Sequence, residues 1–416
     1  MGKLDALTSS ILLAQANDLP LANTNPIEVN MNRRTFIRIV GGGAIFSATA
    51  GLAACSRDMP PEAIAAWKGP QTEMDVRKWI LSYAILAPHS HNLQSWLVDL
   101  RTPDEILLYC DLTRLLPETD PYYRQIMISH GTFLELVDIA ARERGIRTTI
   151  ELFPQGEYGP EAIDQRPLAR IRLAADSGVA KDPLFGQVLH RRTNREAYDL
   201  SNVIQEDAVQ SIADSMQAYP IRFGFVGLDR PEEIKKHRAI AADAWRIELT
   251  TPAKILETYK VLRVGAGEIA QYRDGISIND PFLSLIVRLG LFDRSQAPKP
   301  DDSATLDQIE RFNKNLESTP GFMWMVTEGN DRITQVNAGR AYVRAQLAGT
   351  ALGISMQPLQ QALQEYAEQH RSYTEIHHLL NAPSPRYTVQ MWARLGVGPP
   401  IEPAPRRGLE AHIFNG

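Results

Sequence analysis

The sequence has little cysteine, with only Cys55 and Cys110 among its 416 residues. Two cysteines exclude a disulfide framework, although one bridge remains formally possible. Cys110 ends the apolar run of residues 105–110, which is typical of a strand. We therefore expect Cys110 to be an inert packed residue and assign it no chemistry.

Basic residues are not in excess either, because 44 Lys and Arg stand against 49 Asp and Glu, for a formal net charge of -5. Nothing in this balance indicates a nucleic-acid partner. The share of 44% hydrophobic and 22% charged residues is typical of a soluble globular protein. The length fits two ordinary domains or one body built from two related halves, and 27 prolines and 27 glycines favour an α+β body with many loops.

Several common site motifs are missing as well. There is no Gly-x-Ser-x-Gly elbow and no phosphate-binding Gly-Lys-Thr loop. His89 and His91 could chelate a metal, but no third ligand is suggested by spacing, so we predict no metal site. His377 and His378 lie in an expected helix and are interpreted as surface residues.

The first 55 residues contain no stretch long enough for a membrane span. Residues 39–54 are apolar, but they number only 16 and include three consecutive glycines, whereas a span needs ~20 apolar residues. A buried helix is disfavoured because each glycine costs roughly 1 kcal/mol against alanine. The basic start, apolar middle and small-residue end instead indicate a processing segment, outside the fold.

This segment resembles a bacterial export signal. Arg33 and Arg34, followed by residues 35–38, resemble the twin-arginine signal, and residues 52–55 resemble a lipoprotein box. The resemblance implies contact with the twin-arginine export machinery, lipidation of Cys55, and a lipid-anchored protein on the periplasmic face of a bacterial membrane. Proteins on this route cross folded, commonly with a cofactor inserted. Residues 1–30 carry none of these features, so the natural start is expected at Met31, or residues 1–30 form a mobile tail.

Two helical segments, residues 129–146 and 337–354, can be laid over each other without gaps. The aligned identities are Gly131 with Gly339, Ala140 with Ala348, Gly145 with Gly353 and Ile146 with Ile354. Each segment has apolar residues at three- and four-residue spacing, which marks a buried helix face. We interpret the pair as an internal repeat, against the alternative of two unrelated helices.

Periodicity places the other elements of the body. Helices are expected at 73–87, 205–216, 231–249 and 254–273, and strands at 96–100, 106–110, 148–153, 168–173, 221–226, 322–326 and 387–395. This order predicts an α+β fold with a sheet wrapped by helices in each half. The polar, proline-rich residues 294–320 break the pattern, and we interpret them as a flexible excursion or a lid over a site.

Residues 87–96 lie between a helix and a strand and resemble the nitroreductase loop Ala-Pro-Ser-x-x-Asn-x-Gln-Pro-Trp. His89 and Ser95 depart from that pattern. The resemblance implies that the loop lies against the ring of a bound FMN, where side-chain amides and hydroxyls can bind the O2, N3 and O4 edge. The implied cofactor-binding residues are Pro88, Ser90, Asn92 and Gln94.

A second resemblance concerns the phosphate. Residues 191–195 resemble the Arg-Arg-Ser-x-Arg motif that grips the FMN phosphate, and residues 405–410 resemble the arginine-rich end of the same family. Arginine forks suit a dianionic phosphate, although an arginine group alone is more commonly a solvated face. The implied residues are Arg191, Arg192, Thr193, Arg195, Arg406 and Arg407, with Pro358, Leu359 and Gln360 where the family presents backbone N–H groups to the flavin.

The ring loop occurs only in the first half and the Arg-Arg-x-x-Arg motif only in the second. Ordinary nitroreductases bind FMN between two subunits, so the chain resembles their fused, tandem Acg-type branch. The resemblance implies a pseudo-dimer with one complete FMN site. The predicted organisation is a signal in residues 1–55, a first half in 72–185 and a second half in 186–416.

Three functions stay open at this point. The first is an FMN-dependent oxidoreductase that passes hydride through flavin N5 to a small-molecule acceptor, a nitro compound or a quinone, with no catalytic side chain required. The second is a flavin-binding or sequestering protein with little turnover, since nicotinamide donors are scarce outside the cytoplasm. The third is a lipid-anchored interaction protein whose flavin site has decayed.

Overall fold

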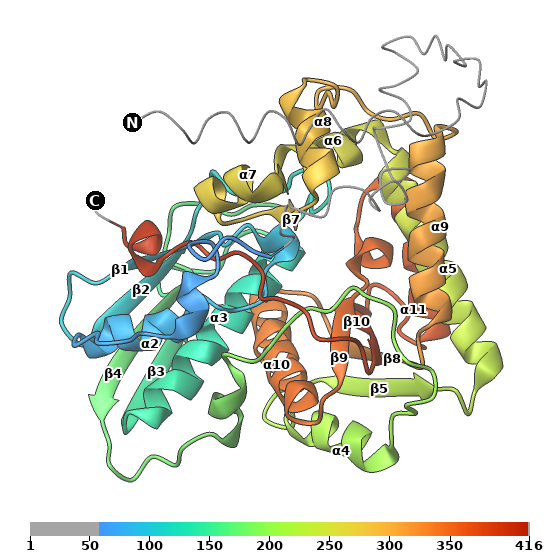
Figure 1. Cartoon of the computed structure of the whole chain (residues 1–416). Helices are drawn as coiled ribbons and strands as arrows, with labels where there is room; N and C mark the ends of the chain where they lie inside the picture. Colours follow the sequence, from blue (N-terminus) through green and yellow to red (C-terminus); the bar gives the residue numbers. More distant parts are fainter. Residues whose placement is uncertain (1–57, 415–416) are drawn as a thin grey trace, which may run out of the picture.

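A computed structural model of the chain describes residues 58–414. The proposed export signal and Cys55 lie outside the described residues. Two four-stranded sheets stand on either side of a central pair of helices (Figure 1). Across residues 58–414, no helix is both long and apolar enough to cross a bilayer.

The first sheet is antiparallel throughout, with strand order β1-β2-β4-β3. Its strands are β1 (Trp96–Asp99), β2 (Glu105–Cys110), β3 (Ile146–Leu152) and β4 (Ala169–Ala175). The helices α2 (Val76–Ala84) and α3 (Arg124–Glu143) share one hydrophobic core with the sheet. Cys110 is buried in this core, and burial raises the pKa of its thiol to about 12, which confirms the predicted inert role.

The second sheet repeats this arrangement, with strand order β5-β8-β10-β9 and all pairs antiparallel. Its strands are β5 (Arg222–Gly227), β8 (Gly321–Glu328), β9 (Ser355–Pro358) and β10 (Tyr387–Gly396). In each half the fourth strand lies between the second and third, and one long helix, α3 or α10 (Arg332–Ala351), joins the second strand to the third. The predicted α+β class, with a sheet wrapped by helices in each half, is confirmed. The boundary after residue 185 stays a prediction.

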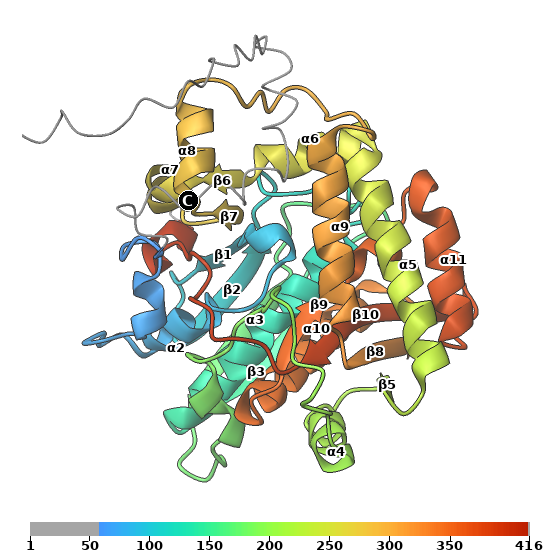
Figure 2. The same ribbon diagram turned by 45° about the vertical axis from the view of Figure 1, so that its right-hand side comes forward.

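The two repeat helices, α3 and α10, pack against each other between the sheets (Figure 2). A Cβ built on Gly131 would collide with the carbonyl oxygen of Val336, and one built on Gly339 would collide with that of Ile128. Glycine at both positions lets the two backbones touch. The predicted helix at 337–354 therefore exists, with α10 starting five residues earlier.

A long insertion separates β5 from β8, where the first half has only the turn between β1 and β2. It comprises α5 (Pro231–Thr250), α6 (Pro252–Lys260), β6 (Leu262–Val264), α7 (Gly265–Tyr272), β7 (Ile276–Ile278), α8 (Pro281–Arg288) and α9 (Ser303–Glu317). The strands β6 and β7 pair in parallel. The insertion has its own small hydrophobic core.

Two predictions for this insertion were wrong. A single helix at 254–273 is interrupted by β6, because residues 262–264 pair with β7 and Gly265 takes a φ of +79° that a helix interior does not allow. The segment 294–320 is not an irregular excursion, because most of it forms α9, and its role as a lid stays a prediction. Phe312 of α9 stacks on Trp245 of α5, with ring centroids 4.8 Å apart, and this packing fixes the helix.

The other predicted elements lie close to their expected positions, including α4 (Glu206–Asp214), whereas α8 and β9 were not predicted. The helix expected around His377 is α11 (His370–Leu379). His377 was wrongly placed on the surface: it is buried, and its Nε2 accepts a hydrogen bond from the Val389 N–H at 3.1 Å. His378 is exposed, as expected.

The C-terminal segment returns from the second half to the first. After β10 the chain passes the N-terminal residues, where the Arg406 N–H donates to the carbonyl of Ala63 at 2.8 Å. It then forms a bridge between Ile413 and Val98 at the edge strand β1. Arginines 406 and 407 are thereby brought from the end of the chain to the ring-side loop that precedes β1.

Candidate functional site

Three arginines from two distant segments gather on one tryptophan. Trp67 lies in a short 3-10 helix (Ala65–Lys68), is nearly buried, and donates from Nε1 to the carbonyl of Ala404 at 2.8 Å. The guanidinium carbons of Arg191, Arg192 and Arg406 lie 5.4, 4.6 and 5.5 Å from its ring centroid. An aromatic face can hold cations together in this way despite their mutual repulsion.

The arginines of this cluster form no direct ion pairs with carboxylates in the described part of the chain, although Glu402 acts on Arg192 electrostatically. Among residues 58–414 no ion pair involves Arg191, Arg192, Arg195, Arg406 or Arg407. Burial, followed by the neighbouring Arg192, lowers the pKa of Arg191 to about 10. Burial, followed by Arg191 and Arg192, holds the pKa of Arg406 well below its ordinary value. Cations gathered at such a cost suit an anionic ligand.

Unpartnered polar atoms occur in the same cluster. The Nε atoms of Arg191 and Arg406 and the hydroxyl of Tyr342 are buried and have no hydrogen-bond partner among the described residues. Tyr342 belongs to α10 and interacts electrostatically with Arg191 and Arg195. On the same helix, the Gln346 amide accepts from Arg191 at 3.1 Å and donates toward the Thr193 hydroxyl at 3.3 Å. These spare donors fit a phosphate.

Arg195 extends the cluster toward the ring-side loop. Its side chain keeps an exposed surface, yet the surrounding protein lowers its pKa through burial. Burial, and next the charge of Arg195, lowers the pKa of His91 in the loop to about 4. His91 is therefore neutral at ordinary pH, and Arg195 lies near the loop.

The ring-side loop, residues 88–95, has an unusual backbone. His91, Asn92 and Gln94 all have left-handed φ values, of 47°, 54° and 55°. Non-glycine residues in this region cost energy and persist where the surroundings hold them. Here α3 holds the loop: the Thr132 hydroxyl donates to the Pro88 carbonyl at 2.7 Å, and the Ser90 N–H donates to the Ser129 hydroxyl at 3.1 Å.

The two departures from the nitroreductase loop pattern, His89 and Ser95, bind each other. His89 Nε2 lies 2.7 Å from the Ser95 hydroxyl oxygen and accepts from the Ser95 N–H at 3.2 Å. His89 Nδ1 lies 2.8 Å from the Ser90 carbonyl, to which it donates in the matching tautomer. Burial lowers the pKa of His89 far below its ordinary value, which keeps the ring neutral. The hydrogen bonds between His89 and Ser95 thus connect the start of the loop to its end.

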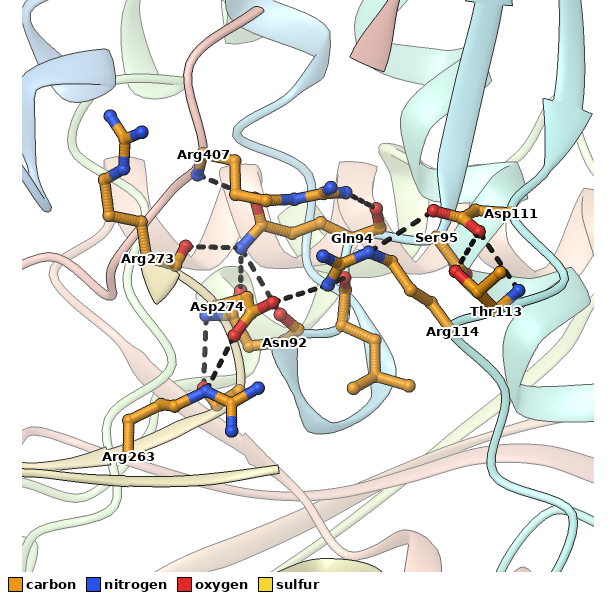
Figure 3. Close-up of polar contacts among 12 residues, drawn as sticks. Asn92, Gln94, Ser95, Asp111, Thr113, Arg114, Arg263, Arg273, Asp274 and Arg407 are labelled. Carbon is orange, nitrogen blue, oxygen red and sulfur yellow. Dashed lines mark hydrogen bonds and ion pairs between the residues drawn. The ribbon is translucent and has the colours of Figure 1, made fainter. Parts of the chain in front are cut away.

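The Asn92 and Gln94 amides are engaged by the protein itself (Figure 3). The Asn92 amide nitrogen donates to the carbonyls of Pro405 and Gly275 at 3.0 and 3.2 Å. The Gln94 amide nitrogen donates to the Arg273 carbonyl at 2.9 Å. The loop is thus fastened both to the C-terminal segment and to the 273–275 turn of the insertion.

The arginine cluster and the loop meet directly. Arg406 donates to the Asn92 side-chain oxygen and, at 3.0 Å, to the Ala87 carbonyl. Arg407 donates from its backbone to the Gln94 side-chain oxygen at 2.9 Å and from its guanidinium to the Gln94 carbonyl at 2.5 Å. Arg191 donates to the Leu86 carbonyl at 2.9 Å, just before the loop. The structure therefore brings the predicted phosphate and ring residues of the two halves together.

Residues 273–275 contact the ring-side loop and are called the roof below. The buried carboxylate of Asp274 fixes the position of this roof. Asp274 is 1% exposed and accepts from Arg114 at 2.5 Å and from Arg263 at 2.9 Å (Figure 3). Arg114 belongs to the first half, whereas Arg263 lies on β6 of the insertion. These two ion pairs therefore connect the insertion to the first half of the chain.

Pro358, Leu359 and Gln360 make their polar contacts within the second sheet. The Leu359 N–H donates to the Trp392 carbonyl at 2.7 Å, and the Gln360 side chain bonds to the backbone of residues 390 and 392. Their flavin contacts stay a prediction. A cavity of about 500 Å³ also lies in this half, and none of the predicted site residues lines it. Its walls are Gln364, Glu365, Tyr366, Ala367, His370 and Tyr373.

Sequence reasoning missed three parts of the site. Trp67 and the 273–275 roof carry no motif and are joined to the site only by the fold. Tyr342 was expected on the buried face of its helix, and it is 2% exposed. Its free hydroxyl was not foreseen, although a tyrosine on a buried face needs a polar partner and could have pointed to one.

Comparisons with known proteins show a similarity to nitroreductases. No protein-family model matches it. Among solved structures, the FMN-dependent nitroreductase of Mycobacterium smegmatis in complex with NADPH is 15% identical, with a TM-score of 0.34, over 54% of this chain and 94% of that one. A nitroreductase from Desulfovibrio desulfuricans in complex with FMN is 12% identical, with a TM-score of 0.31, over 57% of this chain and 98% of that one.

Curated relatives extend over much more of the chain. The protein named "Putative NAD(P)H nitroreductase" of Mycobacterium tuberculosis is 25% identical over 345 residues, 79% of this chain and 88% of the relative, in strains H37Rv and CDC 1551. The chain is thus similar to nitroreductases over 79% of its length.

Proposed function

We propose that the protein is an FMN-dependent oxidoreductase with one flavin site between its two halves. The observation that carries the proposal is the meeting of the Arg191, Arg192 and Arg406 cluster with the Asn92 loop. The cluster has unpartnered donors and no carboxylate partner among residues 58–414, which suits a phosphate. The loop supplies amides and hydroxyls of the kind that bind a flavin edge.

The residues divide into two roles in this proposal. Arg191, Arg192, Thr193, Arg195 and Arg406 would hold the phosphate, with the Tyr342 hydroxyl as a further donor. Pro88 and Ser90 would border the ring. Because the Asn92 and Gln94 amides are already bonded to residues 273, 275 and 405, they would position the loop or exchange these partners on binding.

When bound, FMN would supply hydride transfer through N5, with a nitro compound or a quinone as the acceptor class. The protein would contribute binding, orientation and exclusion of water. The 273–275 roof, fastened by Asp274, would shield the loop side of the site from solvent. No acid or base side chain is required.

Binding of FMN by the purified chain from Ser56 onward tests the proposal. Arg195→Gln removes an exposed cation that no described carboxylate pairs with, so folding should be unaffected while FMN affinity falls about tenfold or more. Arg371→Gln, on the surface of α11, is the matched control and should bind FMN normally. A purified chain that is colourless and does not bind added FMN would overturn the proposal. The third function, a lipid-anchored interaction protein, would then remain.

A flavin-sequestering protein with little turnover is the second candidate, as the Acg-type resemblance implies. The observation that favours it is the locked roof over a loop whose amides are already bonded. Rapid reduction of bound FMN by both NADPH and dithionite, with electron transfer to a nitroaromatic, would support the oxidoreductase. Flavin that dithionite reduces but NADPH does not would support sequestration.

We further propose that the protein is exported by the twin-arginine machinery and anchored through Cys55 on the periplasmic face of a bacterial membrane. The motifs in residues 33–38 and 52–55 support this proposal. Mass spectrometry of the membrane-bound protein tests it, since an unmodified Cys55 or a protein retained in the cytoplasm would refute it.

A further inference from the structure

We propose that the outer face of α8, formed by Leu285 and Leu289, rests on the bilayer that holds the lipid anchor. This inference rests on the proposed lipidation of Cys55. It assigns a surface and an orientation to the folded body, which lipidation alone does not provide.

The anchor point lies beside α8. The Asn279 amide donates to the carbonyl of Asp58 at 2.6 Å, and Asn279 stands directly between β7 and α8. Cys55 precedes Asp58 by three residues, and three extended residues span at most ~11 Å. A lipid on Cys55 would therefore hold the bilayer surface within that distance of the base of α8.

The distance from Asn279 to the exposed leucines is comparable to the maximal distance between Asp58 and Cys55. At 1.5 Å per residue, Leu285 and Leu289 lie roughly 9 and 15 Å along the chain direction from Asn279. The helix stands at one end of the molecule, together with α7 and next to the loop that leads to α9 (Figures 1 and 2).

The exposed face of α8 is apolar. Leu285 and Leu289 are 45% and 57% exposed and stand four residues apart, hence on one face of the helix. Leu283 and Ile286 point the other way and are buried in the core of the insertion. Two neighbouring exposed leucines on a two-sided helix suit shallow burial at a membrane interface.

The proposed contact of α8 with the bilayer does not depend on attraction between opposite charges. Arg288 is the only charged residue within α8, and the nearby Arg294 is paired with Glu268 at 2.8 Å. Asp293, Asp301 and Asp302 follow in the same segment. Residues 281–302 carry three basic and three acidic side chains and thus no net positive charge that would attract anionic lipid. Contact should therefore depend on apolar surface, with Arg288 extending its head to the interface.

Hydrogen exchange on tethered protein tests this. The chain from Cys55 onward is coupled through Cys55 to a maleimide lipid in phosphatidylcholine vesicles, since Cys110 is buried and unreactive. The coupling replaces biological acylation, so the result does not depend on whether the cell lipidates Cys55. Amides of residues 283–292 should exchange roughly tenfold more slowly on tethering. Amides around Leu352, which is 45% exposed at the C-terminal end of α10, should not change on tethering.

Variants decide whether the leucines cause the protection. The double variant Leu285→Gln and Leu289→Gln should abolish it, whereas Leu352→Gln should leave it intact. Unchanged exchange on tethering, or protection that survives the double variant, would overturn the proposal. Protection seen only with phosphatidylglycerol would also overturn it, because it would show attraction by charge.

Discussion

Gly131 of α3 and Gly339 of α10 lie against each other where the two repeat helices cross, and a Cβ on Gly131 would come within 3.0 Å of the Gly339 Cα. Each glycine also faces a backbone carbonyl of the opposite helix, that of Val336 or Ile128. The contact is reciprocal, as expected for two halves related by an approximate twofold axis. Both halves of the proposed flavin site are positioned by this crossing, since α3 supports the loop and α10 supports the arginines.

Alanine at either glycine should therefore separate the helices. We expect Gly131→Ala or Gly339→Ala to lower the free energy of unfolding by about 3 kcal/mol, because backbone atoms cannot move aside as a side chain can. Urea unfolding measures the change. Gly267→Ala in α7 is the control: nothing lies within 4 Å of its Cβ, so it should be neutral or stabilising by up to about 1 kcal/mol. Equal effects at all three sites would contradict this account.

The sequence predicted those features that depend on local pattern. Hydrophobic periodicity located every strand of the two sheets except β9, and the aligned Gly131 and Gly339 marked α3 and α10 as a repeated pair of helices. The arginine and loop motifs were also found together, as their resemblance implied. Each of these signals is contained in fewer than 20 residues.

The features that the sequence did not reveal depend on contacts between distant segments. The helix α9 was hidden by its polar composition and is fixed by the stacking of Phe312 on Trp245. Trp67 meets Arg191 and Arg406 only because the chain ends return to one place. Asp274 reaches Arg114 only because the insertion folds back onto the first half. No short-range sequence pattern predicts these contacts between distant segments.

The pairing of His89 with Ser95 predicts coupled energetics. Ser95→Ala leaves His89 Nε2 with only the backbone N–H of residue 95 as a partner, and His89→Ala removes the partner of that N–H. We expect each variant to lose about 1–3 kcal/mol and the double variant to lose less than the sum, by about 1 kcal/mol. Thermal unfolding of the four proteins gives this coupling energy. Strict additivity would show that the two residues act separately.

The roof should open when Asp274 loses its charge. In Asp274→Asn, Arg114 and Arg263 lose their shared buried counter-charge, which is expected to cost about 3–5 kcal/mol locally. Limited proteolysis should then cut within residues 261–278, and bound FMN should dissociate faster while the two sheets stay folded. Asp293→Asn, an exposed position of the same insertion, is the control. Unchanged flavin release together with increased cleavage would separate the roof from the cofactor site.

Glu248 gives the protein a predictable dependence on pH. The carboxyl is buried in α5 and accepts from the Gln364 amide at 2.8 Å, while burial raises its pKa from 4.5 to about 7. The folded state therefore holds a proton that the unfolded state releases between pH 4.5 and 7. Stability should fall as pH rises through this window, by an amount on the order of 3 kcal/mol, and level off above it.

Glu248→Gln isolates this contribution, since the amide stays neutral and its oxygen can still accept from Gln364. The variant should match the parent near pH 4.5 and exceed it by about 2–3 kcal/mol at pH 8. Urea unfolding at both pH values measures the difference, with the exposed Glu328→Gln as the control. A variant that is less stable than the parent at pH 8 would mean that the ionised Glu248 is stabilised by its surroundings. The pKa of this carboxyl would then lie below its ordinary value, contrary to what its burial dictates.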